Sequence, residues 1–283
     1  MHRACACLAS LFALIGQSAT LQAHVIGKDD RSYLSHAEEE RFAGVGKVHC
    51  DDPTDPDLDY WTTGTLVGDQ KTVFTNGHFG VKPASRRSEP HIFPVEHCEF
   101  RIYAPHGGKF ADGYAYKRFA IASAQRAQPP EAYIDYKADR EDWAVLTLSG
   151  AGVDAASARA LTVRQASMDE LVEEPDSFLI AYHDKVKGID PDARVISPGC
   201  AVRKDRRASD DTWFLLDCDT NKGSSGGLIF AKDATGEHVA LGFATSDGLA
   251  KENDHSNYGQ PFTADVRGRI PGANIPFVPT PKD

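Results

Sequence analysis

The sequence has no Cys-x-x-Cys pair, no excess of basic residues and no long apolar run beyond its first 23 positions. Zinc knuckles need the missing cysteine spacing. Lys and Arg number 31 against 41 Asp and Glu, and this acidic balance argues against nucleic acid or an anionic membrane as the main partner. With 41% hydrophobic residues over 283 positions, the composition is that of a soluble globular protein.

Residues 1–23 have the pattern of a secretory signal peptide. A basic start at residues 2–3 precedes an apolar run at residues 4–16, and small and polar residues follow. The apolar run is too short to span a bilayer. Cleavage after Ala19 and cleavage after Ala23 both fit the pattern. We therefore expect a secreted or periplasmic protein with no membrane span.

Export makes the cysteines outside the leader candidates for disulfide bonds. The four that remain are Cys50, Cys98, Cys200 and Cys218. An even number in an oxidising compartment suggests two disulfides, and we expect one within each half of the chain, Cys50–Cys98 and Cys200–Cys218. A histidine precedes each of the first two cysteines, at His49 and His97, so a Cys2His2 zinc site is the alternative.

Short apolar runs broken by Gly, Pro and Asp fill the chain from residue 42 onward. The segment "WTTGTLVGDQKTVFTNGHF" at residues 61–79 predicts two strands around the turn "GDQ". Further strands are expected at residues 98–104, 116–124, 143–149, 178–183, 193–203, 212–218, 226–231 and 238–246. Only residues 154–163 and 165–174 look helical. This pattern predicts an all-β protein built from two packed β-barrels.

The amino-acid composition changes along the chain and divides it into five parts. After the leader, the polar residues 24–41 suggest a propeptide or a loosely attached N-terminal arm. A segment rich in Gly, Ala and Ser near residues 150–165 separates the two barrels. We therefore expect an N-terminal barrel at 42–155, a C-terminal barrel at 156–270 and a Pro-rich tail at 271–283.

A glycine-dense turn stands out in the second half, in "CDTNKGSSGGLIF" at residues 218–230. Glycines at this density mark a flexible loop or a backbone that bends sharply and approaches another group closely. A serine on such a turn becomes a nucleophile when a histidine takes its proton and a carboxylate orients that histidine. His78 follows a predicted strand, and Asp142 opens the apolar strand "DWAVLTL". Each of these residues alone is more often structural.

Together, "TGTLVGDQKTVFTNGHF", "DWAVLTL", "LIAYHDK", "CDTNKGSSGGLIF" and "LGFATSDG" resemble the chymotrypsin-like serine endopeptidases, in particular the bacterial exported branch that includes glutamyl endopeptidases. The resemblance implies two antiparallel six-stranded β-barrels with the active site in the cleft between them. It also implies a catalytic triad of Ser225, His78 and Asp142, and an oxyanion hole at the amides of Gly223 and Ser225. The expected reaction is hydrolysis of peptide bonds in peptides or proteins through an acyl-enzyme, with no cofactor or metal. The alternative is a non-catalytic homologue that binds a peptide in the same cleft.

The residues around the serine turn lead to two further expectations. Asp219, Thr220, Thr245 and Ser246 are candidates for a substrate pocket. Asp219 either selects a basic or polar side chain or has a structural role. Ser224 stands where trypsin has an acidic residue that pairs with an inserted N-terminus. We therefore expect the oxyanion turn to be ordered by its own glycines and local hydrogen bonds, without a requirement for residues 24–41.

Overall fold

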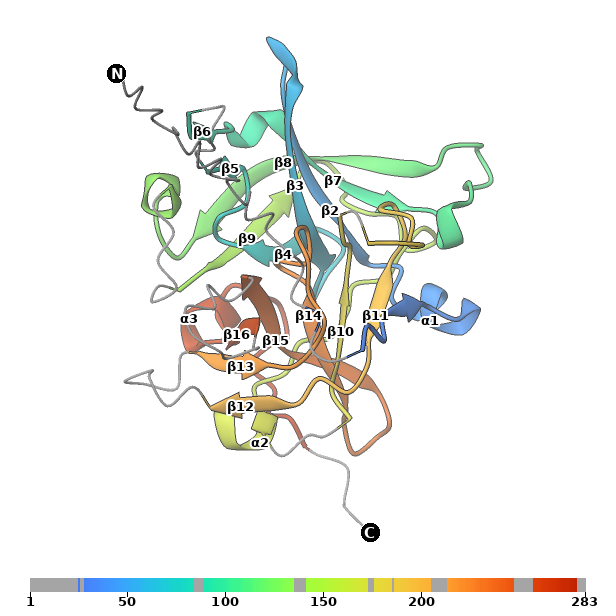
Figure 1. Ribbon diagram of the computed structural model, residues 1–283, viewed down its shortest axis with the longest axis vertical. Helices are drawn as coiled ribbons and strands as arrows, with labels where there is room; N and C mark the ends of the chain where they lie inside the picture. Colours follow the sequence, from blue (N-terminus) through green and yellow to red (C-terminus); the bar gives the residue numbers. More distant parts are fainter. Residues whose placement is uncertain are drawn as a thin grey trace, which may run out of the picture.

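Six antiparallel strands in the first half of the chain close into a barrel, with neighbours in the order β2-β3-β4-β9-β8-β7. Figure 1 shows this barrel in the upper half of the computed structural model. Its strands are β2 (Val45–Asp52), β3 (Asp55–Leu66), β4 (Thr72–Asn76), β7 (Cys98–Tyr103), β8 (Tyr116–Arg126) and β9 (Trp143–Leu148). The predicted hairpin at residues 61–79 forms β3 and β4. Its turn is closed by Asp69, whose Oδ1 accepts the N–H groups of Lys71 at 2.9 Å and Thr72 at 2.7 Å.

A second sheet lies below the barrel in Figure 1, with the strand order β1-β11-β10-β14-β15-β16-β13-β12. Its strands are β1 (Ser32–Tyr33), β10 (Phe178–Ala181), β11 (Val195–Ser197), β12 (Val202–Lys204), β13 (Phe214–Leu216), β14 (Leu228–Lys232), β15 (His238–Ser246) and β16 (Asn257–Pro261). This sheet curls into a half-barrel. The expected all-β class with two packed units is therefore confirmed. The second unit differs from a six-stranded barrel in its larger number of strands, one of which comes from the N-terminal arm.

The structure describes residues 25, 28–83, 89–134, 141–172, 176–184, 186–204, 213–246 and 257–278. The predicted signal peptide and the end of the Pro-rich tail lie outside these residues. In the described part of the chain, no helix combines the length and the apolarity that crossing a bilayer requires.

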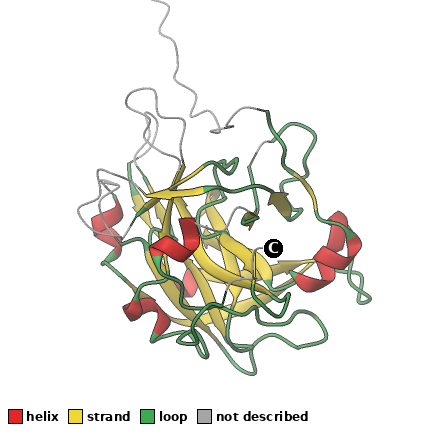
Figure 2. Ribbon diagram, turned by 90° about the horizontal axis from the view of Figure 1, so that it is seen from below, coloured by secondary structure: helices red, strands yellow, loops and turns green. Residues whose placement is uncertain are grey.

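Helices and minor strands occupy little of the chain, and Figure 2 shows the helices at the periphery of the β structure. They are α1 (His36–Arg41), α2 (Met168–Val172), α3 (Ala264–Arg267), the 3-10 turns η1 (Val95–His97), η2 (Pro105–Gly107) and η3 (Pro130–Tyr133), and the strands β5 (Val81–Lys82) and β6 (His91–Ile92). The helix expected at 165–174 contains α2. The helix expected at 154–163 is wrong. Leu161 bridges to Val67 of the barrel and Val163 to Ala240 of the second sheet, so tertiary pairing overrides helix propensity there.

One apolar cluster lies between the two units, in addition to a cluster within each unit. Phe74 of β4 packs against Phe243 of β15 and against Phe262, with ring centroids 4.7 and 5.1 Å apart. All three side chains are at most 1% exposed. Aromatic pairs of this kind add to the free energy gained from buried area. The contact fixes β4, and the turn that follows it, against the second sheet.

Residues 31–41 are built into the fold and are not a loose arm. Strand β1 pairs with β11, and α1 begins with a capping box in which Ser35 and Glu38 bond each other's backbone N–H groups. Glu39 of α1 is 1% exposed and forms an ion pair with the buried Arg194. A buried charge is costly unless it is paired, so this contact fixes the docking of α1 against the second sheet.

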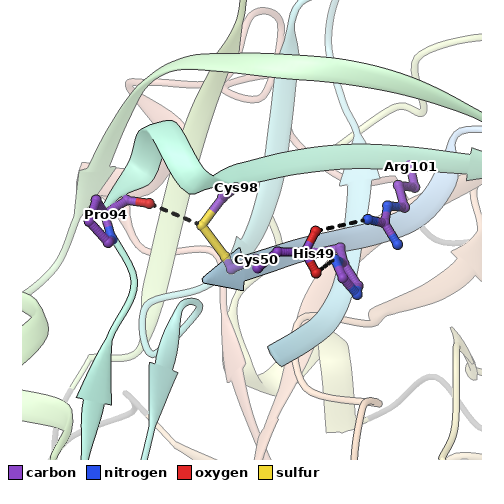
Figure 3. The surroundings of a disulfide bond; sticks show 6 residues. His49, Cys50, Pro94, Cys98 and Arg101 are labelled. Carbon is purple, nitrogen blue, oxygen red and sulfur yellow. Dashed lines mark hydrogen bonds and ion pairs between the residues drawn. A yellow bond between two sulfur atoms is a disulfide. The ribbon is translucent and has the colours of Figure 1, made fainter. Parts of the chain in front are cut away.

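Both expected disulfides are present, Cys50–Cys98 and Cys200–Cys218. Figure 3 shows the first one joining β2 and β7, where Cys50 and Cys98 are direct partners across the ladder. The alternative zinc site is wrong because the disulfide consumes both of its sulfur ligands. A Cβ added at Gly80 would lie 3.4 Å from Cys50 Sγ, so the disulfide packs against the turn that carries His78.

Removing the first disulfide should lower stability more than removing the second. The chain-entropy model gives about 4 kcal/mol for a separation of 48 residues and about 3 kcal/mol for 18. We expect the Cys50→Ala/Cys98→Ala variant to unfold at a clearly lower urea concentration than the wild type, with Cys200→Ala/Cys218→Ala as the matched comparison. An unchanged midpoint for the first variant would contradict the prediction.

Candidate active site

His78 and Asp142 meet at one end of the barrel because the strands that carry them are paired. Asn76 at the end of β4 lies opposite Trp143 at the start of β9, so the residues just beyond face each other. His78 Nδ1 lies 2.8 Å from Asp142 Oδ2, and the backbone N–H of His78 donates to Asp142 Oδ1 at 2.9 Å. A carboxylate only accepts hydrogen bonds, so Nδ1 carries a proton, and in the neutral imidazole Nε2 offers a lone pair.

The corner before His78 is packed by a tyrosine. A Cβ at Gly77 would lie 2.2 Å from Tyr133 Oη, which explains why the chain has glycine there. The Tyr133 hydroxyl donates to the carbonyl of Glu141 at 3.2 Å. Burial and the charge of Asp142 raise the pKa of Tyr133, which keeps this donor protonated.

Asp142 is completely buried, and both units hold it. Its carboxylate bonds His78 of the barrel, while its backbone N–H donates to Gln260 Oε1 of β16 at 3.0 Å. This bond holds the backbone of Asp142 from the side of the second sheet. It therefore ties the histidine corner to the unit that carries the serine turn.

The serine turn is anchored on β3 of the barrel by its backbone carbonyls. Ser225 O accepts from the N–H of Thr63 at 3.1 Å and from the hydroxyl of Thr62 at 2.6 Å. Gly223 O accepts from the hydroxyl of Thr63 at 2.7 Å. The Thr62 hydroxyl also lies 2.7 Å from the side-chain amide of Asn76. The structure thus brings Ser225 to the strand end that precedes His78.

The two serines of the turn have different environments. Ser224 is 2% exposed, and its hydroxyl donates to the carbonyl of Asn221 at 2.7 Å, which closes the turn locally. Ser225 is partly exposed, and within the described residues its Oγ has no hydrogen-bond partner. In the same part of the chain, the N–H groups of Gly223 and Ser225 are also without a protein acceptor. The turn therefore presents one hydroxyl and two backbone donors.

Gly223 has a left-handed backbone and packs directly against an indole ring. Gly223 has φ +93°, and a Cβ there would lie 2.2 Å from the ring of Trp61. The ammonium of Lys47 makes a cation–π contact with the Trp61 ring, 4.1 Å from a ring centroid. Lys47 Nζ also forms an ion pair with Asp192 at 2.6 Å. Burial lowers the pKa of Lys47, and the Asp192 carboxylate opposes this effect. This stack supports the turn from the barrel side.

Three of the four predicted pocket residues are buried. Asp219 is 2% exposed, and its Oδ2 accepts the backbone N–H of Asp30 at 3.2 Å. Thr220 is 1% exposed, and the Thr245 hydroxyl donates to the carbonyl of Tyr258 at 3.3 Å. The side chain of Ser246 lies outside the described residues.

Sequence reasoning missed the residues that support the site from a distance. Gln260 lies 118 positions from Asp142, and Thr62 lies 163 positions from Ser225. Trp61 was predicted only as a strand residue. Their roles depend on the packing of the two units, and no local pattern in the sequence marks them.

Comparison with known proteins places these observations in a family. The model of the trypsin-like peptidase domain matches residues 62–241. A thermostable serine protease, AL20, from an extremophilic microorganism superposes with a TM-score of 0.52 over 81% of this chain and 96% of that one. The two sequences are 14% identical, so the likeness shows a shared fold. No curated protein matches the chain.

Proposed function

The chain belongs to the trypsin-like peptidase domain family, and we propose that it is an exported serine endopeptidase with Ser225 as nucleophile, His78 as general base and Asp142 as orienting carboxylate. The observation that carries the proposal is the His78 ring, bonded through Nδ1 to the buried Asp142 beside the anchored turn of Ser225. The predicted signal peptide and the two disulfides support export.

The reaction follows from the protonation of the imidazole. Substrate binding brings the scissile carbonyl to Ser225, and Oγ attacks its carbon while His78 Nε2 takes the hydroxyl proton. The imidazolium that forms is stabilised by Asp142. His78 then gives the proton to the leaving amine, which departs and leaves an acyl-enzyme. Water, activated by His78 in the same way, hydrolyses this ester.

The negative charge that develops on the substrate oxygen needs fixed donors. The N–H groups of Gly223 and Ser225, which have no acceptor among the described residues, are the donors we propose. Removing one such donor typically costs about 3–4 kcal/mol of transition-state stabilisation. Trp61 and the carbonyl contacts to Thr63 hold Gly223 in place before substrate arrives.

Asp219 is the first candidate for selecting the residue at the cleaved bond. Its carboxylate already accepts a backbone N–H from the N-terminal arm and is buried. Of the two roles that the sequence left open, this contact favours the structural one. We propose that substrate selection depends on other groups of the cleft and that the substrate is a peptide or protein.

Labelling with a fluorophosphonate tests the proposed function directly. The reagent phosphonylates a serine only where a base and an oxyanion hole activate it. We expect one label per chain, and peptide mapping should place it on Ser225. An unlabelled wild-type protein would favour the non-catalytic peptide-binding homologue, and a label on Ser224 would contradict the assignment of the nucleophile.

A further inference from the structure

Three segments distant in the sequence interlock behind the serine turn. They are residues 29–31 of the N-terminal arm, residues 183–184 after β10, and residues 219–222, which lead into the turn. The last two are joined directly, because the N–H of Asp184 donates to the carbonyl of Lys222 at 2.8 Å and the side chain of Asn221 donates to the carbonyl of Asp184. The arm contacts both of them.

Arg31 supplies the central contact. Its side chain is 2% exposed, and its Nη1 lies 3.4 Å from His183 Nδ1 and 3.5 Å from the carbonyl of Thr220. Asp29 neutralises the guanidinium in a bidentate pair, with Nε–Oδ1 at 2.9 Å and Nη2–Oδ2 at 2.7 Å. A single planar cation therefore bridges the two loops behind the turn.

A second contact is made by the backbone of the arm. The N–H of Asp30 donates to Asp219 Oδ2, and the N–H of Asp219 donates to the hydroxyl of Ser197 at 3.0 Å. Just beyond, Ser32 and Tyr33 pair with β11, the strand that contains Ser197. The arm thus reaches residue 219 through the same strand that anchors it.

His183 is a neutral partner in this arrangement. Arginine can only donate, so His183 Nδ1 must accept, and an imidazolium could not do so. Burial and the charge of Arg31 lower the pKa of His183 to about 3, in agreement with the geometry. Asp29 is the acidic group that acts against this shift.

We propose that residues 29–31 form a clamp that positions the oxyanion turn, with Arg31 as its central positioning residue. The proposal rests on the proposed function of Ser225. Residues 29–31 then belong to the active enzyme and are not part of a removable propeptide. A cut in the chain after Arg31 would free this residue from β1 and reduce activity. This revises the expectation that the turn needs nothing from residues 24–41.

The clamp acts on the turn through a short path. Thr220 is three residues from Gly223, and the Asn221 carbonyl between them receives the hydroxyl of Ser224. Loss of the Arg31 bridge would leave this local bond and the Asp30–Asp219 contact intact but would remove the arm's hold on Thr220 and His183. The two backbone donors at Gly223 and Ser225 would then lose part of their fixed orientation. Such a loss lowers kcat, because these donors act on the charge formed in the transition state.

The test compares Arg31→Gln with Arg41→Gln, an arm variant that removes a cation bonded to His238 outside the clamp. We expect kcat for a small peptide ester to fall about 10- to 100-fold in Arg31→Gln, with KM little changed, and to stay near wild type in Arg41→Gln. Arg31→Lys should recover only part of the loss, because a lysine cannot make the bidentate pair and the bridge together. Equal kcat values in Arg31→Gln and Arg41→Gln would overturn the clamp.

Two measurements keep this test separate from other failures. Fluorophosphonate labelling of the wild type shows whether Ser225 is active at all, and a wild type that is unlabelled or labelled on another serine counts against the proposed function, not against the clamp. Arg31→Lys keeps the positive charge and can therefore be studied even if Arg31→Gln does not fold. Amide hydrogen exchange in Arg31→Lys should be faster at residues 219–226 than in the wild type, with exchange in the barrel strands unchanged. Wild-type exchange at 219–226 together with wild-type kcat in Arg31→Lys would also overturn the clamp.

Discussion

Replacing Ser225 with alanine will lower kcat by about 10⁶-fold and leave the fold intact. Residues of a catalytic triad act as a unit, and the loss of the nucleophile alone removes nearly all of their joint contribution. The Ser225 side chain makes no hydrogen bond within the described residues, so its removal leaves no buried polar group unpaired. The measurement is turnover of a peptide ester, with thermal unfolding to show that stability is unchanged.

Ser224→Ala is the matched control for this prediction. In the wild type, the Ser224 hydroxyl closes the 221–224 turn by donating to the carbonyl of Asn221. We therefore expect the variant to lose a modest amount of stability and activity, far less than Ser225→Ala. The fluorophosphonate label should persist in Ser224→Ala and disappear in Ser225→Ala. Full turnover in Ser225→Ala would end the assignment of the nucleophile.

The parts of the site that could be predicted from the sequence are those with a local cause. The turn "GDQ" and the apolar runs on either side of it predict β3 and β4. The glycines around Ser225 mark a backbone that bends sharply and lies close to neighbouring atoms. Cys50 and Cys98 could be paired because they lie in the same half of the chain. In each case the chemistry lies within a few residues or follows from the order of segments.

The parts that could not be predicted depend on packing between segments far apart. Residues 154–163 favour a helix by composition, but Leu161 and Val163 bridge the two units and leave no helix there. The polar arm gives no sign that Glu39 will be buried against Arg194. Arg31 and His183 are separated by 152 positions, and their contact becomes visible only when β1 docks on β11.

Asp142→Asn is the substitution that tests the role of the carboxylate, because both of its oxygens accept hydrogen bonds from His78. Asp142 Oδ1 accepts the backbone N–H of His78, and Oδ2 accepts the proton on Nδ1. An asparagine has one oxygen and one NH₂ group for these two donors. The backbone N–H cannot change its role, so the amide oxygen will face it, and the NH₂ group will face Nδ1. The imidazole must then accept at Nδ1 and carry its proton on Nε2, which is the wrong tautomer for a base toward Ser225.

We therefore expect kcat of Asp142→Asn to fall by about 10⁴-fold, with a folded protein and little change in KM. The loss is smaller than that for Ser225→Ala because the oxyanion donors and the nucleophile remain. Gln260→Leu is a useful comparison, since it removes the acceptor for the backbone N–H of Asp142 without touching the carboxylate, and it should cost much less activity. The check is steady-state turnover of the peptide ester together with NMR of the imidazole nitrogens, which reports the proton on Nε2 in Asp142→Asn and on Nδ1 in the wild type. A variant that keeps the wild-type tautomer but loses activity would show that Asp142 acts through the charge of its carboxylate, and one that keeps full activity would remove Asp142 from the mechanism.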